Sequence, residues 1–97
     1  MSNRDEYAEK MKAQVDLWNS QMATWESAAR EATSEAKFEL ERQLGILKSR
    51  LDDTVFRMEL LKGASADAWQ DIARGADKAR KAMHDALEKA RVHFKDL

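Results

Sequence analysis

The side chains best suited to catalysis or metal binding are few in this sequence, and their spacing does not build a site. His84 and His93 are the two histidines, and there is no cysteine. Nine residues on an α-helix correspond to about 900° of rotation, so the two imidazoles face opposite sides and cannot bind one metal ion from a single helix. Neither histidine stands in a His-Glu-x-x-His or Glu-x-x-His spacing. We therefore expect no bound metal and no cofactor.

The carboxylates and serines are equally poor candidates for an active site. Asp52 and Asp53 are adjacent, which places them about 100° apart on a helix and favours a solvated face over paired acid-base chemistry. The serines have no base positioned near them in the sequence, and no glycine-rich loop could hold a phosphate. They are Ser20, Ser27, Ser34, Ser49 and Ser65. We predict that the protein is not an enzyme.

The composition predicts an all-α fold for these 97 residues, organised as one helical domain over 1–97. Charged residues make up 36% of the chain, with three glycines and no proline, a bias typical of long helices and coiled coils. The 17 basic and 18 acidic residues are mixed, so no field of one sign would attract nucleic acid. The opening residues "MSNRDEYAEK" contain no apolar run of the secretory type, and no segment has ~18 consecutive apolar residues. We expect a cytoplasmic protein.

One apolar or small residue recurs every three or four positions from Tyr7 to Leu61, the period of a single helical face. The stripe consists of Tyr7, Met11, Val15, Trp18, Met22, Trp25, Ala29, Ala32, Ala36, Leu40, Leu44, Leu47, Leu51, Thr54, Met58 and Leu61. Ser2 or Asn3 is suited to cap its start, with Glu6 in capping-box spacing from Asn3. The pattern predicts one long helix over about 3–61, with a stutter in the heptad between Ala32 and Leu44.

The segment "KGASAD", residues 62–67, is the one convincing interruption. Gly63 can take the left-handed conformation that ends a helix, and Ser65 can cap the next helix. A second stripe from Trp69 to Leu97 then predicts a helix over about 66–96. A short connection of this kind predicts an antiparallel coiled-coil hairpin. The alternative is a continuous rod of about 95 residues that passes through Gly63 and pairs with a parallel copy.

In such a hairpin the shorter second helix leaves the N-terminal part of the stripe without an intramolecular partner. These residues are Tyr7, Met11, Val15, Trp18, Met22 and Trp25. An uncovered apolar stripe of this size is unusual on a monomer, and a symmetric contact needs only one self-complementary patch. We predict self-association through these residues into a homodimer or four-helix assembly.

Three segments of the sequence resemble small bacterial proteins described as coiled-coil domain-containing. They are "YAEKMKAQVDLWNSQM", the alanine-rich "AAREATSEAKFELERQL" and "LLKGASADAWQDIARGADKARKAMHDALEKA". The resemblance implies a helical protein and transfers no catalytic residue. The C-terminal amphipathic run is also similar to apolipoprotein-like helices and to the phasins that coat storage granules. Two functions are therefore expected: a self-associating scaffold or adaptor or, alternatively, a reversible binder of lipid or granule surfaces.

Overall fold

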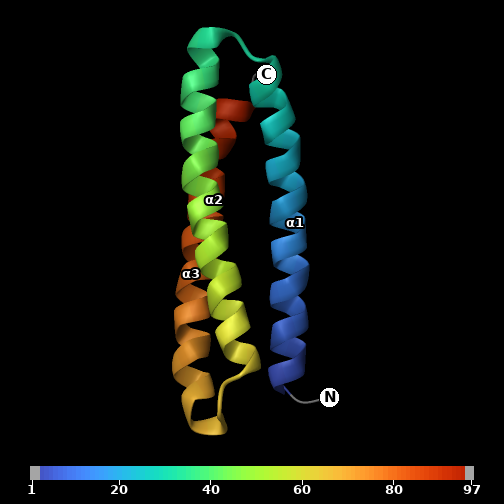
Figure 1. Cartoon of the computed structure of the whole chain (residues 1–97), viewed down its shortest axis with the longest axis vertical. Coiled ribbons are helices and arrows are strands. Elements are labelled where there is room, and N and C mark those ends of the chain that lie inside the picture. Colours follow the sequence, from blue (N-terminus) through green and yellow to red (C-terminus); the bar gives the residue numbers. More distant parts are fainter. Residues whose placement is uncertain (1–2, 96–97) are drawn as a thin grey trace.

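A computed structural model describes residues 3–95 and folds them into three α-helices of equal length that lie side by side (Figure 1). α1 spans Asn3–Glu31, α2 spans Ser34–Lys62 and α3 spans Ala66–Phe94. The molecule measures 50 × 20 × 17 Å along its principal axes. A 29-residue helix is about 43 Å long, so the bundle is one helix long. The predicted all-α class is confirmed, whereas a continuous rod and a first helix of about 90 Å are both too long for it.

The predicted single helix over 3–61 is wrong, because the chain reverses at Ala32 and Thr33. Thr33 has extended backbone angles (φ −63°, ψ 158°), and its hydroxyl oxygen accepts a hydrogen bond from the Ala36 N–H at 3.4 Å. This is an N-cap, which a threonine side chain satisfies well and an uninterrupted helix does not use. The 3.6-residue period continues across the break, so periodicity alone had concealed it.

The second connection lies at the predicted "KGASAD" segment and joins α2 to the antiparallel α3. Ser65 caps α3, with its hydroxyl oxygen accepting a hydrogen bond from the Ala68 N–H at 3.3 Å. Gly63 follows the last residue of α2 with φ −99° and ψ 3°, so the predicted left-handed conformation is wrong. The turn closes instead with a hydrogen bond of 3.3 Å from the Ala64 N–H to the Leu61 carbonyl.

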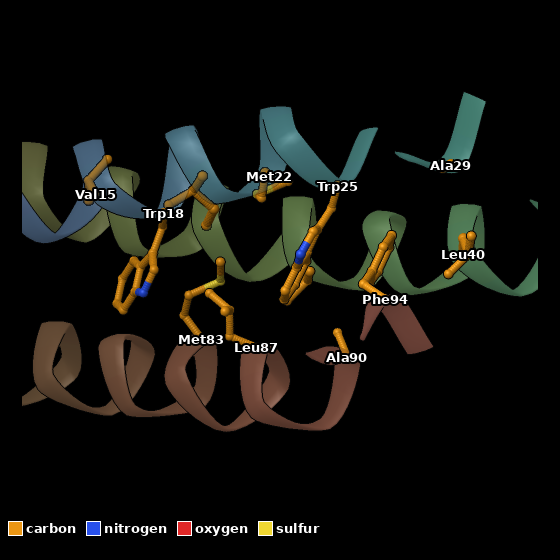
Figure 2. Packing of buried hydrophobic residues seen from close by; sticks show 12 residues of the cluster. Val15, Trp18, Met22, Trp25, Ala29, Leu40, Met83, Leu87, Ala90 and Phe94 are labelled. Carbon is orange, nitrogen blue, oxygen red and sulfur yellow. The ribbon is translucent and has the colours of Figure 1, made fainter. Parts of the chain in front are cut away.

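The core lies between the three helices, and the large side chains of α1 meet both small and large side chains of α3, such as Ala90 and Phe94. α2 packs closely against both neighbours, whereas the backbones of α1 and α3 approach each other less. Trp18, Met22 and Trp25 extend from α1 into this wider space, as Figure 2 shows. On α3, the buried Ala90 belongs to the same cluster as the indoles of Trp18 and Trp25, whereas the buried Ala76 packs in a second cluster with Met11. Interdigitation of large and small side chains gives the dense packing that a small core requires.

Three details of the predicted helix ends lie outside the described residues. They are the alternative N-cap at Ser2, the end of the last helix at residue 96 and the final stripe residue, Leu97. None of the three helices in the described part of the chain combines the length and the apolarity needed to cross a bilayer.

Candidate interaction surface

The N-terminal stripe predicted to mediate self-association lies inside the bundle. Trp18 and Trp25 are only 6% and 7% exposed, and Met11, Val15 and Met22 are also buried. Tyr7 is partly buried and packs against the same core. The prediction that these residues have no intramolecular partner is wrong, because the reversal at Thr33 returns α1 alongside the other two helices. Their burial requires no second copy of the chain.

Trp25 closes the core at the end where α1 and α3 finish. Its ring stacks on Phe94 with a centroid separation of 4.6 Å and an interplanar angle of 2° (Figure 2). The Arg91 guanidinium lies 6.0 Å from the centroid of the indole. Such contacts add to the burial of apolar area, so this cluster stabilises the fold and is not a free ligand site.

Tyr7 joins α1 to α3 at the opposite end of the bundle. Its ring meets Trp69 edge-on at 5.5 Å, and its hydroxyl donates to Asp77 Oδ1 at 2.5 Å, with the Ala73 carbonyl oxygen at 3.3 Å. Burial raises the pKa of the Tyr7 phenol above its ordinary value, and the contact with the Asp77 carboxylate raises it further. Nearby, Arg4 donates to the Ala64 carbonyl at 2.8 Å and ties the start of α1 to the 63–65 turn.

The side chains that could take part in catalysis or metal binding do not come together in the structure. His84 is exposed, while His93 Nε2 lies 3.8 Å from Oε1 of Glu39. Hydrogen bonds from Arg42, and then from Gln43, lower the pKa of Glu39 to about 2, so this carboxylate is an ion-pair partner and not a proton donor near neutral pH. Within residues 3–95, no group of histidine, aspartate and glutamate side chains could hold a metal ion.

The hollows in the surface are open grooves between helices with charged rims. One groove of about 480 Å³ between α2 and α3 is lined by Ile46 and by charged side chains that include Arg50, Asp85 and Lys89. Another of about 480 Å³ between α1 and α3 includes Trp18, Arg80 and His84. Neither pairs a nucleophile with a base, and open charged grooves lack the enclosure of a typical substrate site.

Large apolar side chains that face solvent concentrate on α2. Of the six such side chains in the described part of the chain, four belong to this helix: Phe38, Ile46, Phe56 and Leu60. Phe38 and Phe56 are 76% and 60% exposed. The other two, Leu17 on α1 and Val92 on α3, are isolated on their helices. Scattered exposed apolar residues are ordinary, but four on one helix indicate an interaction surface.

Three of these four side chains, all except Ile46, belong to a line of exposed residues opposite the core face of α2, here named the α2 outer strip. It consists of Phe38, Arg42, Gly45, Ser49, Asp52, Phe56 and Leu60. Steps of three or four residues keep all seven on one face. Phe38 and the buried Leu47 are nine residues apart, about half a turn out of phase. The inner stripe of apolar residues hides this strip in the sequence, although its spacing of three and four residues is present there.

Comparison with protein-family models, with curated proteins and with solved structures finds no match to this chain.

Proposed function

We propose that the protein is a non-enzymatic scaffold or adaptor that self-associates through the α2 outer strip. The observation that carries this proposal is that three of the six exposed large apolar side chains in the described part of the chain, Phe38, Phe56 and Leu60, lie on this strip. The predicted N-terminal stripe no longer suits this role, because its large residues form the core of the single chain. A scaffold needs a rigid body and at least one accessible apolar surface, and the α2 strip offers that surface.

The experiment is a measurement of mass in solution by sedimentation equilibrium over a wide concentration range. We expect the parent chain to dimerise and a Phe38→Ser/Phe56→Ser variant to be monomeric. A Leu17→Ser/Val92→Ser variant is the matched control: it also replaces two exposed apolar residues, but on α1 and α3, and should dimerise like the parent. A parent chain that stays monomeric at the highest concentration overturns the proposal.

The second candidate is reversible binding to a lipid or granule surface, and the fold offers one specific argument for it. α1 is joined to α2 by only Ala32 and Thr33, and its contacts with α3 are made mainly by side chains. Rotation about this connection would present Trp18, Met22 and Trp25 to an apolar interface. The mixed charges provide little attraction to anionic headgroups.

Flotation with phospholipid vesicles separates the two candidates. Surface binding predicts that the protein floats with the vesicles and that a Trp18→Ala/Trp25→Ala variant floats less. Protein that remains in the dense fraction with both neutral and anionic vesicles would exclude binding to a phospholipid surface.

A further inference from the structure

We infer that a second copy of this chain docks antiparallel on the α2 outer strip, with a two-fold axis at Ser49. The inference rests on the proposed function and specifies its partner, surface and register. Symmetric dimers need a surface that is complementary to itself, so the patch on one copy must fit the same patch of the other copy running in the opposite direction. The α2 outer strip has this property.

The apolar residues of the strip are placed symmetrically about its centre. With the axis at Ser49, residue i of one copy faces residue 98 − i of the other. Phe38 then meets the partner's Leu60, and Arg42 meets the partner's Phe56, where a guanidinium can lie over an aromatic ring. Each contact occurs twice, so apolar contacts close both ends of an interface about 33 Å long. In a parallel pair, Arg42 would face a second Arg42 instead.

Gly45 is the independent sign that another backbone approaches this face. A glycine inside a helix destabilises it by about 0.5–1 kcal/mol relative to alanine. At Gly75 the space beside the backbone is taken by a flexible side chain, since an added Cβ would lie 2.6 Å from Arg57 Nη1. At Gly45 an added Cβ would meet nothing within 4 Å, and φ is not positive. Together with Ser49 one turn later, Gly45 forms a small-residue pair that allows a second helix to pack closely.

Charges beside the strip are also complementary in this register. Same-side positions of two antiparallel helices face each other, which brings Arg42 near the partner's Asp53 and Lys48 near the partner's Asp52. All four side chains are exposed. Within one chain Arg42 pairs with Glu39 and Asp53 with Arg57, and these exposed pairs can be shared across the interface. Two like-charge pairs oppose docking: Glu41 lies on the same side as the partner's Glu59, offset from it by about 3 Å along the helix axis, and the two Lys48 side chains lie beside each other at the two-fold axis.

The absence of cysteine makes the register directly testable by cross-linking single-cysteine variants with a short bismaleimide. We expect Ser49→Cys to cross-link with itself. Phe38→Cys should not cross-link with itself but should do so when mixed with Leu60→Cys. Leu17→Cys, on the exposed face of α1, is the control and should give no dimer band.

The outcomes separate the inference from the proposed function. Self-cross-linking of Phe38→Cys would mean a parallel pair, which overturns the register and leaves self-association standing. Dimers that cross-link only through Leu17→Cys would place the interface elsewhere and overturn both. A chain that is monomeric by sedimentation also removes both.

A charge substitution gives a second test that does not depend on cross-linking. Glu41→Lys replaces a repulsive contact with an attractive one to the partner's Glu59, twice per dimer. We expect the dimer Kd to fall roughly fivefold, from the usual strength of exposed ion pairs. Glu9→Lys makes the same change on the outer face of α1 and should leave the dimer Kd unchanged. A weaker dimer for Glu41→Lys would contradict the antiparallel register.

Discussion

Trp25 and Phe94 stack with their ring planes 2° apart, and this contact joins the C-terminal parts of α1 and α3. At the other end, Tyr7 and Trp69 make an edge-on contact between the N-terminal parts of the same helices. The two aromatic pairs therefore bridge the helices whose backbones are least closely packed. Trp25 is held by one of these pairs, and Trp18 is buried in the same core cluster, so both tryptophans of α1 belong to the fold of one chain.

Replacement of Trp25 by alanine should destabilise the chain strongly. A buried tryptophan cut back to alanine loses about 3–5 kcal/mol of unfolding free energy through lost burial and a cavity. Urea unfolding followed by far-ultraviolet circular dichroism measures this loss. In a double-mutant cycle with Phe94→Ala, the two residues should couple by about 0.5–1.5 kcal/mol. The control Leu17→Ala should change stability by less than about 0.5 kcal/mol.

The same experiment distinguishes burial within one chain from burial between copies. If α1 were covered by a second copy, the effect of Trp25→Ala would diminish as the parent chain was diluted and dissociated. We expect the loss in unfolding free energy to be independent of protein concentration. A loss that disappears on dilution would contradict the intramolecular core.

The phenol of Tyr7 should resist ionisation until the protein unfolds. Tyr7 is the one tyrosine of the chain, so the near-ultraviolet absorbance of tyrosinate reports on this residue alone. Burial and the Asp77 carboxylate favour the neutral phenol and raise its pKa above the ordinary value of about 10. We expect the native protein to titrate above pH 10, and an Asp77→Asn variant to titrate closer to the ordinary value. An ordinary titration in the native parent would contradict the contact.

The raised pKa also predicts how stability changes with pH. Above about pH 10 the unfolded chain releases the phenolic proton while the folded chain retains it, so the stabilisation is complete below pH 10 and is lost as pH rises toward the folded pKa. The unfolding free energy of the parent should therefore fall more steeply above pH 10 than that of Tyr7→Phe. Equal slopes for the two proteins would show that Tyr7 is not shifted.

The helical class followed from the composition, the second connection from the cap residues Gly63 and Ser65, and most core residues from sequence periodicity. Leu47, Met58 and Met83 lie on the predicted stripes and are buried. The prediction of one continuous helix failed at Ala32 and Thr33, because a short connection can preserve the 3.6-residue period on both sides while the chain turns back. Threonine is an N-cap residue and an acceptable helix residue alike, so its local preference did not decide between the two.

The missed reversal at residues 32–33 also made the predicted self-association surface wrong. If α1 and α2 formed one continuous helix, the indoles of Trp18 and Trp25 would lie beyond the hairpin, where they would be available for self-association. With α1 folded back, they enter the core, and the accessible apolar residues become Phe38 and Phe56. Which face of α2 remains exposed depends on where α1 packs, and this is tertiary information that the α2 sequence alone does not contain.

The N-cap at Thr33 should contribute measurably to the unfolding free energy of the chain. Thr33→Ala removes the acceptor for the Ala36 N–H and should reduce the unfolding free energy by about 0.5–2 kcal/mol. Thr33→Ser keeps a hydroxyl at the same position and should stay close to the parent. Thermal unfolding of the three proteins gives the comparison. If Thr33→Ala were more stable than the parent, a continuous helix through residue 33 would be favoured.

Gly45→Ala should have opposite effects on the folded chain and on its dimer. In the single chain the added methyl meets nothing, and alanine favours the helix, so the unfolding free energy should rise by about 0.5–1 kcal/mol. At dilutions where the chain is monomeric, calorimetry should show Tm raised by about 2–8 °C for a domain of this size. In the antiparallel dimer the same methyl lies one turn from the two-fold axis, where the two helices are close, so it separates the two copies and raises the dimer Kd. Gly75→Ala is the matched control: its methyl must displace the Arg57 side chain, so it should gain less stability, and it lies away from the strip and should leave the dimer Kd unchanged. A Gly45→Ala chain with both a higher Tm and a tighter dimer would show that no second helix packs closely at this glycine.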